Sequence, residues 1–293
     1  MTGATVTVGN GRVLAYEQVG DSAGIPVFVL HGTPGSRLSS LRQHPERVAD
    51  AGLRVITYDR PGYGRSSRQR GRSVVDCVAD VAAIADELGL ERFAVTGGSG
   101  GGAHALAVGA RLPERVMRVL CDAGGAPYDA PDLDWFEGMD PENVQEFSWA
   151  LEGEETLVRE LQREAGEFLA RLDEDPAALL SGFELGDADR AALQDPELQR
   201  GWDESLRESL RDGVWGWVDD DLAFVKPWGF EVDELRVPVE IRYGVADVLV
   251  PPGHGAWLAA HVPDAVATVE EGGGHLLTPK QHLGKLREFV AGL

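Results

Sequence analysis

The stretch that decides the fold runs from Arg92 to Ala105 and reads RFAVTGGSGGGAHA. It begins with an apolar run typical of a β-strand, passes through glycines on both sides of Ser99, and continues into small residues typical of a helix. This context matches the G-x-S-x-G turn, in which a strained serine holds its hydroxyl above a sheet. Glycines at 97 and 101 remove Cβ atoms that would collide where strand and helix meet. The stretch therefore predicts Ser99 as an exposed nucleophile.

The same glycines permit a second interpretation. Residues 98–103 also fit G-x-G-x-x-A, and Asp122 ends the next apolar run, as in a dinucleotide-binding fingerprint with its ribose-binding acid. That fingerprint belongs to the first βα turn of its domain, whereas at least four strand-like segments precede it here. A dinucleotide-dependent oxidoreductase is thus a remote alternative, and a glycine-rich loop without chemistry is another.

A candidate acid and a candidate base follow Ser99 along the chain. Asp247 lies just past the apolar segment 237–241, and His275 follows the strand-like segment 265–269 and three glycines. Both fall at strand ends, where a mostly parallel sheet gathers its functional loops. The order Ser, Asp, His is found in serine catalytic triads and differs from the order in either of the two serine protease folds. Asp122 also follows a strand-like segment, so it competes with Asp247 as the acid.

An acyl-transfer serine needs hydrogen-bond donors for the oxyanion that develops on the attacked carbonyl. The backbone amide of Gly100, directly after Ser99, is one expected donor. The amide of Thr33 is the other, in the loop after the all-apolar strand 26–30. His31 is expected to pack that loop and to border the substrate pocket, and Gly98 is expected to leave room beside the nucleophile.

The rest of the chain alternates strands with helices. An Asn10-Gly11 turn joins two strands at 5–8 and 13–19 into a hairpin. Six further strands and five helices follow, which predicts an α/β fold with a mostly parallel eight-stranded sheet covered by helices on both faces. The expected strands are 26–30, 53–58, 92–96, 117–121, 237–243 and 266–270, and the expected helices are 38–51, 73–89, 100–111, 253–261 and 279–291.

The middle of the chain breaks this alternation. We interpret 1–128 and 227–293 as the catalytic body and 129–226 as an inserted, acidic helical lid. Residues 129–225 contain 28 Asp and Glu against 7 Arg and no Lys, so they carry −21 of the chain's formal charge of −22. Short amphipathic helices are expected there, with a solvated acidic outer face. Five of the seven tryptophans lie in the segment, and Trp135, Trp215 and Trp217 are expected to line the pocket.

Four stretches resemble an α/β-hydrolase-fold serine hydrolase with a lid. They are His31-Gly32-Thr33-Pro34-Gly35-Ser36, Asp59-Arg60-Pro61-Gly62-Tyr63-Gly64-Arg65-Ser66, the turn at Ser99, and 244–252 together with His275. The segment 59–66 resembles one that proline iminopeptidases, haloalkane dehalogenases, epoxide hydrolases and cofactor-free haloperoxidases of that superfamily have in common. The resemblance implies Asp247 rather than Asp122 as the acid, because 244–252 matches the family's acid loop.

The serine at position 99 limits the classes of reaction that this fold could catalyse here. Dehalogenases and epoxide hydrolases of this fold use an aspartate where this chain has Ser99, so a serine favours acyl substrates attacked through an acyl-enzyme. The expected substrate is an ester or related acyl compound that is small, uncharged and fairly hydrophobic. Alternatives are a non-hydrolytic enzyme of the same fold, acting by cyclisation, acyl transfer or carbon–carbon cleavage, and a proline iminopeptidase-like aminopeptidase.

The composition of the chain indicates which partners, cellular location and cofactors to expect. The strong negative charge disfavours nucleic acid as a partner, because it repels phosphates. No apolar run is long enough for a membrane-spanning helix, and the first residues show no secretory signal, so a cytoplasmic location without membrane association is expected. Cys77 and Cys121 are interpreted as isolated thiols rather than a disulfide or a metal site. No cofactor and no metal are expected.

Overall fold

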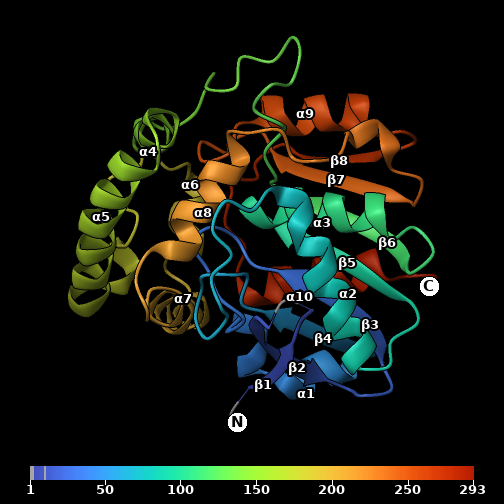
Figure 1. The fold of residues 1–293 in the computed structure, drawn as a ribbon. Helices are drawn as coiled ribbons and strands as arrows, with labels where there is room; N and C mark the ends of the chain where they lie inside the picture. The colour runs from blue at the N-terminus through green and yellow to red at the C-terminus, as the bar shows by residue number, and fades with distance from the viewer. Residues whose placement is uncertain (1–2, 10) are drawn as a thin grey trace.

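The computed structural model describes residues 3–9 and 11–293, and one eight-stranded sheet forms its centre (Figure 1). The strand order is β1-β2-β4-β3-β5-β6-β7-β8. β2 pairs antiparallel with β1 and β4, and all other neighbours are parallel, which confirms the predicted sheet. In the predicted hairpin turn, Asn10 lies outside the described residues. The strands are β1 (Ala4–Thr7), β2 (Val13–Gly20), β3 (Ile25–Leu30), β4 (Leu53–Tyr58), β5 (Phe93–Gly98), β6 (Val116–Asp122), β7 (Val239–Gly244) and β8 (Val266–Glu270).

The parallel register of the central strands places the site. β3, β5 and β6 lie side by side, with Leu30 opposite Gly97 and Gly98 opposite Asp122. Because these residues end their strands, the loops that follow them meet at one edge of the sheet. The loop 31–36 and Ser99 therefore lie next to each other although they are far apart in the sequence.

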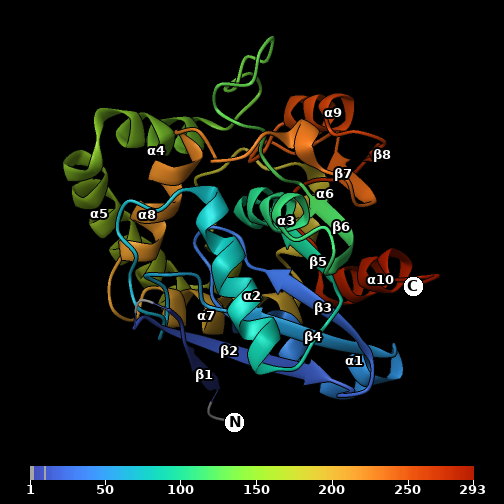
Figure 2. The same cartoon turned by 45° about the vertical axis from the view of Figure 1, so that its right-hand side comes forward.

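Helices cover both faces of the sheet because the central strands are apolar on both sides. Val27 and Val29 point to one face, whereas Phe28 and Leu30 point to the other. The Val27 face is covered by α1 (Pro45–Asp50) and α10 (Pro279–Phe289), and the Phe28 face by α2 (Cys77–Glu87), α3 (Gly100–Arg111) and α9 (Pro252–His261) (Figure 2).

Between β6 and β7 the chain forms a helical segment, which we call the α4–α8 segment. Figure 1 shows α4, α5, α7 and α8 together along one side of the molecule. Two apolar clusters hold the segment together, one around Leu161 and Trp217 and another around Leu179 and Leu198. Its role as a lid stays a prediction. The helices are α4 (Pro141–Glu152), α5 (Glu154–Glu174), α6 (Asp187–Ala192), α7 (Pro196–Ser209) and α8 (Trp215–Phe224).

The acidic segment contacts the body largely through arginines. The distances are 2.7 Å for Arg37–Glu208, 2.8 Å for Arg68–Asp219 and 3.2 Å for Arg47–Glu197. Part of the acidic charge therefore docks the segment, in addition to the solvated face that the composition predicts. Across the described chain, every helix is too short or too polar to cross a bilayer.

Candidate active site

Ser99 occupies the sharp turn between β5 and α3. Its φ of 54° and ψ of −130° lie where a residue with a side chain is rarely found. Two glycines permit the turn: a Cβ on Gly97 would lie 2.0 Å from the Gly101 carbonyl oxygen, and one on Gly101 would lie 2.3 Å from that of Leu30. Strain of this kind persists only where the surroundings impose it, and it clusters at functional sites. Among the described residues, none binds the Ser99 hydroxyl, so that oxygen is open to the adjoining cavities.

Asp247 and His275 meet on neighbouring loops after β7 and β8. Nδ1 of His275 lies 2.8 Å from Oδ2 of Asp247. The other carboxylate oxygen accepts the amides of Leu249 and Val250, both at 2.9 Å. Asp247 is buried, and these bonds fix its orientation. Since an ionised carboxylate only accepts, Nδ1 carries the proton, and Nε2 of the neutral ring is left as an acceptor.

The α4–α8 segment supports the His275 loop. Buried Asp189 of α6 accepts the amide of Leu276 at 2.7 Å. A Cβ on Gly274 would lie 2.3 Å from the same carboxylate, so the helix touches the loop closely. Burial alone would lower the pKa of His275, but Asp247, with smaller contributions from Asp189 and Asp122, raises it above its usual value.

Asp122, the competing candidate acid, lies at the end of β6 and pairs with a different residue. Its two oxygens lie 3.2 and 3.3 Å from Nζ of Lys285 on α10. Asp247, and not Asp122, is therefore the carboxylate bonded to His275. The ion pair with Lys285 also occupies the carboxylate that a dinucleotide ribose would need, and residues 98–103 belong to the fifth strand of the chain and the helix after it, rather than to a first βα turn.

The loop after β3 lies against Ser99. A Cβ on Gly32 would be 3.4 Å from Cβ and 3.9 Å from Oγ of Ser99. The amides of Thr33 and Gly100 find no acceptor among the described residues, and Gly100 begins α3, where the first amides have no intrahelical partner. Both predicted oxyanion donors are therefore unoccupied.

His31 builds this loop. Its Nδ1 lies 2.7 Å from the Gly32 carbonyl oxygen, and its Nε2 accepts the Arg60 amide at 3.2 Å. Burial and the Arg60 charge hold the pKa of His31 well below its usual value, so the ring is neutral. His31 also borders the larger of two cavities that meet at Ser99.

Two cavities meet at Ser99. The larger, about 320 Å³, lies between the strand ends and helices α5 and α7, and both His275 and Gly98 border it. A Cβ on Gly98 would meet nothing closer than 3.8 Å, so this side of Ser99 is open. The smaller cavity, about 140 Å³, is bordered by Thr33 and Gly100 as well as Ser99. Its aromatic walls are Trp135, Phe147, Phe168, Phe183, Trp217, Phe224 and Trp228.

Two of the three tryptophans predicted for the pocket border the smaller cavity. Trp135 donates its indole N–H to the Ala126 carbonyl at 2.9 Å, and Trp217 donates to Glu146 at 2.8 Å. The prediction for Trp215 needs correction, because in the described structure its ring borders neither of these cavities. It lies instead beneath the Arg68 guanidinium, 4.4 Å from the ring centroid. Two positions along α8 rotate a side chain by about 200°, which turns Trp215 away from the cavity that Trp217 borders.

Two acidic side chains also border the smaller cavity. Burial raises the pKa of Glu146 to about 7, and burial together with the Glu146 charge raises that of Asp221 well above its usual value. The pair thus retains a proton near neutral pH.

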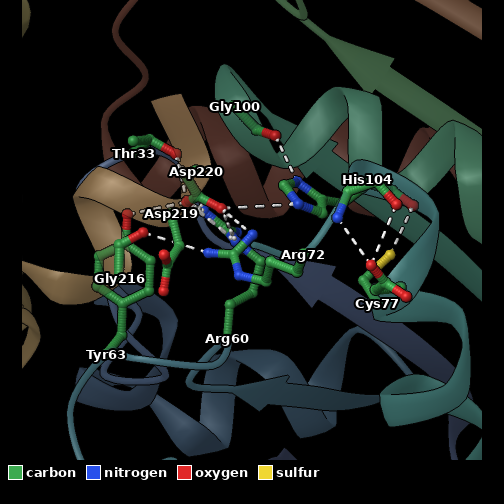
Figure 3. Close-up of polar contacts among 12 residues, drawn as sticks. Thr33, Arg60, Tyr63, Arg72, Cys77, Gly100, His104, Gly216, Asp219 and Asp220 are labelled. Carbon is green, nitrogen blue, oxygen red and sulfur yellow. Dashed lines mark hydrogen bonds and ion pairs between the residues drawn. The ribbon is translucent and has the colours of Figure 1, made fainter. Parts of the chain in front are cut away.

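Sequence reasoning missed the three successive aspartates 219–221 on α8. All three are buried, and the central one, Asp220, forms the polar network drawn in Figure 3. These aspartates could have been recognised in the sequence as three adjacent acids inside an apolar stretch. Such acids are expected to be buried and paired, since buried acids are rare unless they are paired.

The comparisons with known proteins show the family to which the chain belongs. Residues 25–278 match the family model described as alpha/beta hydrolase fold, and the chain belongs to this family. It is 26% identical over 287 residues to a proline iminopeptidase from Neisseria meningitidis serogroup B, covering 90% of this chain and 87% of that protein. It is 27% identical to a 2-hydroxy-6-oxononadienedioate/2-hydroxy-6-oxononatrienedioate hydrolase from Cupriavidus pinatubonensis, covering 85% and 80%.

The chain also resembles a solved structure and matches several relatives over part of their length. A thermophilic esterase from Thermogutta terrifontis has a TM-score of 0.67 at 22% identity, covering 98% of this chain and 96% of that one, which shows a shared fold. Several other relatives, among them proline iminopeptidases from Xylella fastidiosa and Xanthomonas citri, match over only 35% to 42% of their own length. The chain is thus an α/β-hydrolase with hydrolase relatives.

Proposed function

We propose that this protein is a serine hydrolase that cleaves a carboxylic ester or related acyl bond through an acyl-enzyme on Ser99. The observation that supports this most is the strained Ser99 at the junction of two cavities, with the hydrogen-bonded Asp247 and His275 in loops at the same edge of the sheet. A serine rather than an aspartate in the turn favours acyl chemistry.

In this mechanism His275 is the general base. Nε2 takes the Ser99 proton as the oxygen attacks the acyl carbon, and the ring later returns that proton to the leaving group. Asp247 holds the tautomer and stabilises the imidazolium. The bond between nucleophile and base commonly tightens only when substrate binds, and the proposal requires a Ser99–His275 hydrogen bond in that complex.

Thr33 and Gly100 supply the proposed oxyanion hole. Gly100 follows Ser99 in the chain, the Thr33 side chain lies against Gly100, and neither amide has an acceptor among the described residues. Two backbone donors fixed before the reaction stabilise the tetrahedral intermediate without reorganisation. Loss of one such donor typically lowers kcat by about 10²- to 10³-fold.

The two cavities suggest how the substrate lies. The leaving group must be near His275, which protonates it, and His275 borders the larger cavity. The acyl group then enters the smaller, aromatic cavity beside Gly100. Apolar walls on both sides favour a small, uncharged and fairly hydrophobic substrate.

Esters of graded acyl length test this proposal. Ser99→Ala is expected to reduce turnover by about 10⁶-fold, as in a well-studied serine protease. Asp247→Asn is expected to reduce kcat by about 10⁴-fold. Asp122→Asn is the matched control and should cost at most about tenfold, because Asp122 binds Lys285. A Ser99→Ala enzyme that keeps several per cent of its activity would refute the mechanism. A larger loss of kcat in Asp122→Asn than in Asp247→Asn would show that Asp122 is the triad acid.

A second candidate is an aminopeptidase-like hydrolase of aminoacyl bonds, supported by the acids of the smaller cavity. An ammonium group on the acyl part of a substrate would replace the proton that Glu146 and Asp221 retain. It would also lie among the aromatic side chains that border this cavity, and aromatic ring faces attract cations. The similarity to a proline iminopeptidase also supports this candidate.

Aminoacyl p-nitroanilides, free and N-acetylated, separate the two candidates. The aminopeptidase candidate predicts a preference for the free amine, and Glu146→Gln should raise KM for that substrate by about tenfold or more while leaving the acetylated one unchanged. Equal rates for both forms, with esters preferred, would exclude this candidate and leave the first.

A further inference from the structure

Asp220 of α8 lies at the centre of a buried network that joins the α4–α8 segment to the body (Figure 3). Its carboxylate accepts the hydroxyls of Thr33 at 2.7 Å and Tyr63 at 2.8 Å. It also pairs with Arg60 at 2.6 Å and with Arg72 at 2.7 Å. All of these partners belong to the body, whereas Asp220 belongs to the inserted segment.

Two of these contacts reach the loop that carries the proposed oxyanion donor. Thr33 is bound to Asp220 directly through its hydroxyl. Arg60, held by the same carboxylate, donates to the carbonyl oxygens of His31 and Gly32, the latter at 2.9 Å. The backbone from 31 to 33 is therefore fixed on its carbonyl side by Arg60 and at the Thr33 side chain by Asp220.

The Thr33 hydroxyl also lies close to the second donor. A Cβ on Gly100 would be only 2.5 Å from Thr33 Oγ1, so the Thr33 side chain rests on the Gly100 backbone. His104, one turn along α3, hydrogen-bonds the Gly100 carbonyl through Nδ1 at 2.8 Å, and its Nε2 lies 3.7 Å from Asp220. The Thr33 hydroxyl thus contacts Asp220 and also lies against the Gly100 backbone.

The charges in the network keep Asp220 ionised. Burial alone would raise the pKa of Asp220, but the charges of Arg60 and Arg72 hold it well below its usual value. Burial lowers the pKa of His104 to about 3, so that ring is neutral. Asp220 is therefore an anion that accepts hydrogen bonds from the Thr33 and Tyr63 hydroxyls.

We propose that Asp220 is a positioning residue through which the α4–α8 segment completes the oxyanion hole: its bond to the Thr33 hydroxyl aims the Thr33 amide at the developing oxyanion. This inference rests on the proposed function. It means that the segment does more than cover the substrate, because the catalytic donor is correctly placed only while α8 is docked.

A matched pair of variants tests this link without removing Asp220, whose loss would leave two buried guanidinium groups without their carboxylate. Thr33→Val and Tyr63→Phe each remove one hydroxyl that donates to the same Asp220 oxygen. Only Thr33 belongs to the oxyanion loop. Thr33→Ser keeps the hydroxyl and serves as the conservative rescue.

The readouts are kcat and KM on one activated ester, inhibition by a boronic acid that forms a tetrahedral adduct on Ser99, and thermal unfolding. Thr33→Val is expected to lower kcat by about ten- to a hundredfold, with KM within about twofold, because a displaced donor acts mainly on the transition state. The inhibition constant of the boronic acid should rise in parallel. Thr33→Ser and Tyr63→Phe should stay within about threefold of the parent in kcat, even if Tyr63→Phe lowers the unfolding temperature as much as Thr33→Val does.

Two outcomes are distinguished by labelling the parent enzyme with a fluorophosphonate. If the parent is labelled at Ser99 but Thr33→Val and Tyr63→Phe have equal kcat values, the network is merely structural and this inference alone is overturned. If the parent is not labelled at Ser99, the proposed function fails and the inference fails with it.

Discussion

At the scale of single residues, the candidate site depends on groups whose roles follow from their partners. Asp247 has both oxygens engaged, one by His275 and the other by two amides, so it can orient the imidazole ring without moving. Asp247 and His275 could be predicted from the sequence because each follows an apolar strand and lies in a glycine-containing loop. Asp220 escaped prediction because its partners Arg60 and Thr33 are 160 and 187 residues away.

The pH dependence of the reaction tests the His275 environment. The base must be neutral, and carboxylates led by Asp247 raise the pKa of His275 above its usual value of 6.5. Activity should therefore rise with pH, with an acid-limb midpoint above about 6.5. In Asp189→Asn, which removes a second negative charge from the ring's surroundings, this midpoint should move down. A profile of kcat/KM from pH 5 to 9 measures both, and an upward shift in the variant would contradict this assignment.

At the scale of elements, the turn between β5 and α3 was the most predictable part of the structure, and α8 was the least. The turn is recognisable because its signature lies in consecutive residues. By contrast, α8 is buried from Gly216 to Phe224 and has no amphipathic stripe from which a helix could be predicted. Without a polar face, the pattern gave neither the helix nor the direction of its side chains, and Trp215 was therefore misplaced.

Two glycines of the turn provide a matched test. Gly100→Ala should lower kcat by about 10²-fold or more, because its Cβ would lie 2.5 Å from the Thr33 hydroxyl oxygen and 2.9 Å from Phe224, separating the two oxyanion donors. Gly98→Ala should retain activity within about threefold, since its Cβ meets nothing closer than 3.8 Å. Steady-state kinetics on one ester, with unfolding temperatures as a control for folding, decides between them. Equal losses in the two variants would show that the donors are placed elsewhere.

At the scale of the whole molecule, the charge partition seen in the sequence has a structural consequence. The α4–α8 segment docks through two kinds of ion pair. On α7, Arg42–Glu204 and Arg47–Glu197 are solvent-exposed and Arg37–Glu208 is nearly buried, whereas on α8 the Arg60–Asp220 pair is fully buried. The sequence predicted the acidity but not this division, because it depends on which face of each helix meets the body.

Salt should therefore affect the two helices differently. Exposed pairs contribute about 0 to 1 kcal/mol each and are screened at about 1 M salt, whereas buried pairs are screened much less. Hydrogen exchange measured at low and at high salt should show less protection of the α7 amides at high salt, by less than about tenfold, with α8 unchanged. Parallel loss of protection in both helices would mean that exposed pairs hold the whole segment.

An acyl-enzyme on Ser99 would be detected by mass spectrometry of the protein quenched in acid during turnover of an activated ester. We expect an intact mass increased by one acyl group, located by fragmentation on Ser99 in the peptide spanning β5 and α3, and absent from Ser99→Ala under the same conditions. An acyl group on another residue, or turnover that persists in Ser99→Ala without any adduct, would contradict this mechanism.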